Sequence, residues 1–183
     1  MLSPINTDLA THYISEFQVL LYLLPKVGVA LLVGTLVGIE REYRGKLAGI
    51  KTNALICAAS ALFTASSLIM SEYGSISPAP SADVTRIVAQ IVSGIGFLGA
   101  GAIFKSSSKV QGLTTAAVIW SVAALGILIG YGIFFATIVI TLIFLIFLSI
   151  ISSLERKYFR VHGGLHGHAH HDHDKGSRGL PMG

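Results

Sequence analysis

Five apolar stretches, separated by short polar connections, make up most of the chain. A helix that crosses a bilayer needs about 20 mainly apolar residues. Five stretches reach or approach that length, and they lie at residues 16–39, 53–70, 87–104, 113–129 and 133–151. The pattern predicts an all-α protein, a polytopic transmembrane helix bundle of about five spans.

The first stretch is interrupted by Pro25 and Lys26. Either one tilted helix kinks at Pro25, or residues 13–24 lie in the membrane interface and the crossing begins near Pro25. We favour the kinked crossing, because a lysine near one end of a span can extend its amine toward the membrane surface. The predicted organisation is an outward-facing segment at 1–15, a transmembrane domain at 16–154 and a cytoplasmic tail at 155–183.

Composition agrees with a membrane protein. Hydrophobic residues make up 52% of the chain and charged residues 12%, against about 25% charged residues in soluble domains. A soluble globule with so few charges would expose large apolar patches to water. Composition therefore excludes an ordinary soluble enzyme and a nucleic-acid-binding module. We expect no enzymatic activity in the membrane either, because Ser93 has no histidine among the spans to activate it.

The basic residues indicate an orientation. Eleven of the 13 lysines and arginines fall after the first, third and fifth stretches, which are alternate connections. Cytoplasmic connections carry such an excess. We therefore expect the amino terminus outside the cell and the carboxyl terminus in the cytoplasm.

The connection after the first stretch carries a charged motif, EREYRGK. Glu40 and Arg44, and likewise Glu42 and Lys46, are four residues apart with the acid first, which is the favourable order for ion pairs on a helix. These charges are either solvated on a helix extension or form a latch that holds the connection in one conformation.

A second motif opens the third stretch. Asp83, Arg86, Gln90 and Gly94 recur at spacings of three and four residues, so they share one helix face. Ionisable groups in a span usually face a bundle interior or a wet cavity, and we expect this stripe to do so. Asp83 is also a candidate N-cap. Four glycines either permit close packing, which we favour, or break the helix and expose carbonyls that hold a cation; they are Gly94, Gly96, Gly99 and Gly101.

Smaller motifs mark the fourth stretch. Gly112, Thr114 and Thr115 stand at its start, where the threonine hydroxyls either cap the helix, which we favour, or bond to a neighbouring helix. Two glycine pairs at spacings of four, Gly34/Gly38 and Gly126/Gly130, present small-residue faces. Such faces pack helices within a chain, in a homodimer or against another membrane protein, and we expect a homodimer.

The tail is rich in histidine. Its composition is typical of disorder, and neutral imidazole is a good ligand for Zn²⁺ or Ni²⁺. Magnesium prefers oxygen ligands. The tail is therefore either a solvated segment without a defined site or a transition-metal-binding segment, with candidate ligands His166, His168, His170, His171 and His173.

Taken together, three segments resemble the MgtC/SapB family of bacterial inner-membrane proteins: GTLVGIEREYRGKLAGIKTNAL, RIVAQIVSGIGFLGAGAIF and GLTTAAVIWSVAALG. Long members carry a folded soluble domain after the last span, and about thirty residues follow it here, so we expect a short form. The resemblance extends the candidate site to Asp83, Arg86, Gln90, the glycines of the third stretch, Gly112, Thr114 and Thr115. It also brings in Glu40, Arg41, Glu42, Arg44, Lys46, Gly49 and Thr52.

The resemblance implies a role in divalent-cation homeostasis, mainly of magnesium. The stripe leading toward a glycine-rich interior slightly favours a transporter or transport accessory with Mg²⁺ as substrate. The alternative is a non-transporting regulator that contacts another membrane protein, such as a transporter or an ATPase. Handling of Zn²⁺ or Ni²⁺ by the tail is a further alternative. The expected partners are the lipid bilayer and a second copy, with no nucleic acid.

Overall fold

The longest helix, α1, extends from Pro4 to Tyr43 and continues on both sides of Pro25. It belongs to a computed structural model that describes residues 4–74, 84–106 and 109–162. Within α1, the segment Glu16–Tyr43 is long and apolar enough to cross a membrane. A proline inside such a helix is tolerated because neighbouring groups satisfy the freed carbonyl.

Four further helices follow α1. They are α2 (Ile50–Gly74), α3 (Val84–Gly101), α4 (Leu113–Gly130) and α5 (Phe134–His162). Each contains a segment long and apolar enough to span a membrane. The predicted all-α fold with five membrane helices is therefore confirmed.

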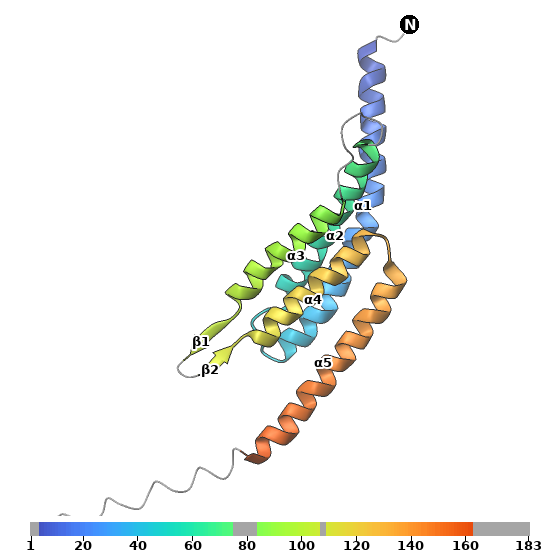
Figure 1. Cartoon of the computed structure of the whole chain (residues 1–183). Coiled ribbons are helices and arrows are strands. Elements are labelled where there is room, and N and C mark those ends of the chain that lie inside the picture. Colours follow the sequence, from blue (N-terminus) through green and yellow to red (C-terminus); the bar gives the residue numbers. More distant parts are fainter. Residues whose placement is uncertain (1–3, 75–83, 107–108, 163–183) are drawn as a thin grey trace, which may run out of the picture. The chain divides into compact units, whose positions relative to one another are not determined.

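Helices α1, α3 and α4 pack around α2. In Figure 1, α2 lies against both α1 and α4, and α3 packs on α4 and α2. The chain divides into two units, residues 1–145 and 146–183, so this packing belongs to the first unit. In the second unit α5 continues as a regular helix, and the Ser152 hydroxyl donates a 2.8 Å hydrogen bond to the Leu148 carbonyl.

Glycines bring the backbones of these helices into contact. A Cβ placed on Gly38 would lie 2.5 Å from the Cα of Ile50 in α2, and one on Gly126 would collide with the carbonyl oxygen of Cys57. Gly34 and Gly130 approach α2 in the same way. Both small-residue faces that predicted a homodimer are thus used for packing within this chain.

Two helices end in Schellman motifs. Gly45, with φ of +64°, follows α1, and the N–H groups of Gly45 and Lys46 donate to the carbonyls of Glu42 and Arg41 at 2.9 and 3.0 Å. Gly132, with φ of +86°, ends α4 in the same way. This left-handed conformation satisfies the last carbonyls of a helix and reverses the chain.

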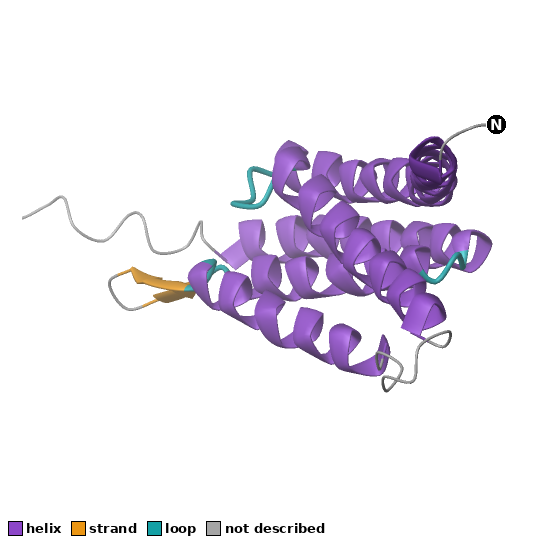
Figure 2. Cartoon of the chain, turned by 90° about the horizontal axis from the view of Figure 1, so that it is seen from above, coloured by secondary structure: helices purple, strands orange, loops and turns teal. Residues whose placement is uncertain are grey.

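A short antiparallel hairpin connects α3 to α4, where the sequence predicted only a basic connection. Strand β1 (Phe104–Ser106) pairs with β2 (Lys109–Gln111), with Lys105 opposite Val110. Figure 2 shows the strands projecting beyond the helices. Because β1 starts at Phe104, the third helix ends earlier than its apolar stretch suggested.

Candidate functional site

The α1–α2 corner, residues 40–53, holds six charged side chains. Glu40 lies between two arginines: the Arg41 Nε donates to it at 2.6 Å, and the Arg44 Nε donates to its other oxygen. Arg41 is 1% exposed, and its Nη1 atom is buried without a hydrogen-bond partner. Of the two ion pairs that the spacing predicted, Glu40–Arg44 is present, and Arg41 is a second partner of the same carboxylate.

Glu42 has a different partner from the one that its spacing predicted. Its Oε2 atom accepts a 3.0 Å hydrogen bond from the backbone N–H of Ile50, the first residue of α2. Gly49 makes room for this contact, because a Cβ there would lie 2.6 Å from the same oxygen. Glu42 therefore caps α2 from the end of α1, while Lys46 and Thr52 are exposed.

Asn53, which was not among the predicted site residues, is fully buried in this corner. Its Nδ2 atom donates to the carbonyls of Ala48 and Gly49 at 2.9 Å each, and its Oδ1 atom has no partner. The signal that could have found it is an amide at the start of an otherwise apolar stretch. Asn53 holds the connection against the beginning of α2.

The described residues of the predicted α3 stripe are exposed. Ile95 and Gly99 are the buried residues of α3, and at 3.6 residues per turn they lie opposite Arg86, Gln90 and Phe97. Arg86 and Gln90 are exposed. Arg86 therefore does not face this chain's interior, whereas Gln90 and Gly94 line the α2–α3 groove described below. Asp83 lies outside the described residues.

The α3 glycines also differ in whether they contact the rest of the chain. A Cβ on Gly99 would touch the Cβ of Ala116 in α4 at 3.6 Å, as close packing predicts. A Cβ on Gly94, Gly96 or Gly101 would meet nothing within 4 Å, so packing within the chain does not explain these three. The alternative, a broken helix, also differs from the structure, where α3 is continuous to Gly101.

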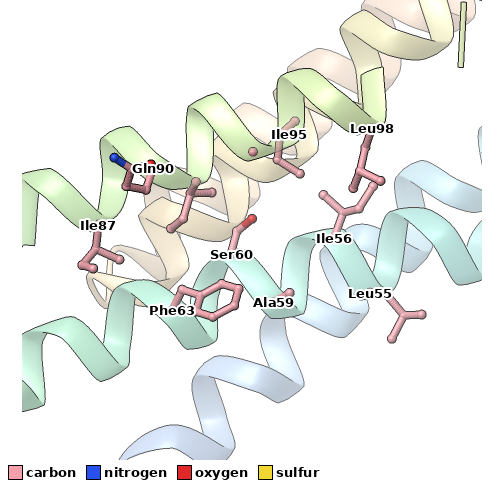
Figure 3. Close-up of a pocket in the computed structure, with 11 residues that line it drawn as sticks. Leu55, Ile56, Ala59, Ser60, Phe63, Ile87, Gln90, Ile95 and Leu98 are labelled. Atoms are coloured by element: carbon pink, nitrogen blue, oxygen red, sulfur yellow. The ribbon is translucent and has the colours of Figure 1, made fainter. Parts of the chain in front are cut away.

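An apolar groove of about 580 Å³ lies between α2 and α3. Figure 3 shows side chains of both helices along it, with Gln90 at its α3 side and Ser60 at its α2 side. Gln90 and Gly94 thus border the groove as well as the outward side of α3. The other lining residues are apolar: Leu55, Ile56, Ala59, Phe63, Ile87, Ile91, Ile95 and Leu98.

The start of α4 uses backbone conformation rather than threonine hydroxyls. Gly112 is the N-cap residue, with φ of +88° and no side-chain hydrogen bond at the cap. The preferred capping role of Thr114 and Thr115 is therefore wrong; Thr114 is exposed and Thr115 is buried. A Cβ on Gly112 would collide with the Ala102 carbonyl oxygen, which explains the glycine.

Lys26 is a second buried cation that the sequence did not single out as a site. It is 5% exposed, its amine donates a 2.8 Å hydrogen bond to the Gly130 carbonyl, and the nitrogen lies 3.7 Å from the Tyr22 ring centroid. A cation at the carbonyl end of α4 is favourable, because that end carries partial negative charge.

Metal-ligand chemistry is not concentrated in the described part of the chain. No group of three or more histidine, cysteine, aspartate or glutamate side chains is found there that could hold an ion. The candidate ligands His166, His168, His170, His171 and His173 lie outside the described residues.

Five apolar helices and a buried charged corner define a multi-pass membrane protein. The sequence pattern of the MgtC family matches residues 27–157, and the chain belongs to this family. It is 50% identical over 103 residues to "Protein MgtC" of Brucella abortus (strain 2308), covering 56% of this chain and 40% of that protein. It is 45% identical over 116 residues to "Protein MgtC" of Salmonella typhimurium (strain LT2), covering 63% and 46%.

The chain thus spans less than half the length of these curated relatives. No solved structure is similar to it.

Proposed function

We propose that this chain supports magnesium homeostasis in the bacterial inner membrane by contacting a membrane transport protein, without conducting the ion through its own bundle. The magnesium role comes from the family resemblance. In this proposal the role is non-enzymatic, the amino terminus is outside the cell and the carboxyl terminus is cytoplasmic, as the basic connections favour.

We prefer contact with another protein over ion conduction because of where the polar residues of α3 lie. Arg86 and Gln90 are exposed and Gln90 borders the α2–α3 groove, whereas α1, α2 and α4 meet at glycines such as Gly38 and Gly126. Mg²⁺ keeps its water shell and prefers six oxygen ligands. Passage between these helices would require backbones in contact to separate, and this favours contact.

In this proposal the buried charged corner forms a rigid surface on the cytoplasmic side. Glu40, Arg41 and Arg44 are joined by hydrogen bonds, and Glu42 ties the end of α1 to the start of α2. A connection held in this way presents a fixed surface, which lowers the ordering cost of binding another protein.

Two measurements test the proposal. Mg²⁺ flux into proteoliposomes containing the purified, folded chain should not exceed flux into empty liposomes, and flux above that baseline would overturn the contact mechanism in favour of transport. In a bacterium lacking its own family member, the chain should restore growth at limiting Mg²⁺. Failure of the well-expressed chain to restore growth would contradict the magnesium role.

A further inference from the structure

We propose that the outward face of α3, comprising Arg86, Gln90, Gly94, Phe97 and Gly101, binds the same face of a second copy of this chain. The proposal goes beyond the function proposed above and does not depend on it. Its starting point is the side of α3 opposite the buried Ile95 and Gly99, which carries the exposed Arg86, Gln90 and Phe97.

The Gln90 amide makes this face costly in lipid. Gln90 is exposed and lies in the second turn of α3, within a segment apolar enough to cross a membrane. Acyl chains offer no hydrogen-bond partner, so an amide there is left unsatisfied. An opposing helix with polar groups supplies the missing partners.

A second copy fits this requirement because the face is self-complementary. Copies inserted with the same orientation are related by a two-fold axis along the membrane normal, which places identical residues opposite each other. An amide carries both donor and acceptor groups. Gln90 of one copy can therefore donate to Gln90 of the other and accept from it.

The remaining residues allow two such helices to approach closely. Gln90, Gly94, Phe97 and Gly101 follow spacings of four, three and four residues, the repeat of a helix–helix seam. A Cβ on Gly94 or Gly101 would meet nothing within this chain, and Phe97 is 82% exposed. The Phe97 ring of one copy can thus fill the space beside Gly94 and Gly101 of the other.

The end of the face and its edge are also compatible with two copies. Arg86 lies in the first turn of α3, and the two-fold axis brings the Arg86 side chains of both copies to the same end of the pair. Each guanidinium can extend away from the other into water at the membrane surface, where repulsion between like charges is weak. Gln90 and Gly94 also line the apolar α2–α3 groove, so the surface offered to the second copy continues into a recess.

Cysteine cross-linking in native membranes tests the geometry. In a Cys57→Ala background, Gln90→Cys and Phe97→Cys should form disulfide-linked dimers on mild oxidation. Val92→Cys is the matched control, because Val92 is 39% exposed but lies on another side of α3. We expect several-fold more dimer at the two face positions than at the control. Equal cross-linking at all three positions, or none at any, would overturn the proposal and leave lipid or another protein as the occupant.

A second measurement addresses the Gln90 pair without cysteines. Energy transfer between labelled copies, diluted in lipid vesicles, reports the dimer dissociation constant. Gln90→Leu should weaken the dimer about threefold to thirtyfold, the range expected for one interhelical polar contact in a membrane. Gln90→Asn, which keeps an amide, should retain most of the affinity. An unchanged constant in Gln90→Leu, with unchanged helicity, would contradict the pairing.

Discussion

The amine of Lys26 donates a 2.8 Å hydrogen bond to the carbonyl oxygen of Gly130, joining residues 104 positions apart. Gly130 is the last residue of α4, where carbonyls lack partners within the helix. The same nitrogen lies over the Tyr22 ring. One buried basic side chain in α1 thereby satisfies a carbonyl at the end of α4.

Replacing this lysine should destabilise the fold. In Lys26→Met the Gly130 carbonyl loses its partner, and we expect a loss of about 1 to 3 kcal/mol, the usual cost of leaving a buried hydrogen-bonding group unsatisfied. The thermal midpoint of helicity in detergent is the measurement. Lys51→Met, at an exposed lysine, is the control and should leave the midpoint unchanged. Equal midpoints for the two variants would remove the role assigned to Lys26.

Gly126→Ala should be far more damaging than the same change at Gly28. The new methyl group at position 126 would collide with the Cys57 carbonyl, whereas one at position 28 would meet nothing within 4 Å. Overpacking of this kind costs about 1 to 3 kcal/mol or more, while alanine favours an open helix position. The yield of monodisperse protein and its thermal midpoint should fall only for Gly126→Ala. A Gly28→Ala variant that is equally impaired would contradict this packing.

Substitutions of Glu42 distinguish helix capping from the ion pair that its spacing suggested. Glu42→Ala removes the acceptor for the Ile50 N–H and should cost about 1 kcal/mol. Glu42→Gln keeps an oxygen acceptor and should recover most of that loss. Hydrogen exchange at the first turn of α2 is the readout, and it should accelerate in Glu42→Ala alone. If Lys46→Met accelerates exchange as much as Glu42→Ala, the ion pair is the correct interpretation.

Substitutions at the start of α4 distinguish a requirement for the backbone conformation of Gly112 from capping by a threonine side chain. Gly112→Ala forces a side chain onto φ of +88° and into the Ala102 carbonyl, so we expect a lower thermal midpoint and a displaced hairpin. Thr114→Val should have little effect, because no side chain hydrogen-bonds at this cap. A larger loss in Thr114→Val than in Gly112→Ala would restore threonine capping.

The histidine tail leads to a separate binding prediction. Removal of residues 163–183 should abolish tight binding of Zn²⁺ and Ni²⁺ by the purified protein, because imidazole is the expected ligand. Titration calorimetry of the full chain and the shortened chain measures this difference. Mg²⁺ binding should not change with the deletion. Undiminished Zn²⁺ and Ni²⁺ binding after the deletion would place the ligands elsewhere in the chain.

Much of the fold was predictable because it depends on local composition. An apolar stretch of about 20 residues must form a helix in lipid, since its backbone has no other hydrogen-bond partners there. The five helices and their order therefore followed from the pattern alone. The β1–β2 hairpin did not, because three-residue strands are too short for an alternating pattern to be recognised.

In the candidate site, too, only the contacts local to one helix were predictable from the sequence. Spacing placed Glu40 within reach of Arg44, and an i,i+4 pair is local to one helix. The partner of Glu42 depends on how the chain turns at Gly45, which brings the start of α2 back to the end of α1. Local spacing could not distinguish this acceptor role from an ion pair with Lys46.

Long-range partners and the direction of each helix face required the packed helices. Spacing grouped Arg86, Gln90 and Gly94 on one side of α3, but a periodic pattern does not say which side meets the rest of the chain. Packing of Gly99 on Ala116 turns that side outward. Likewise, Lys26 meets Gly130 only because α1 and α4 are brought together in the fold. The rotation of each helix and the hydrogen-bond partners of its side chains depend on contacts between segments distant in sequence. The length of each span depends only on the composition of its own segment.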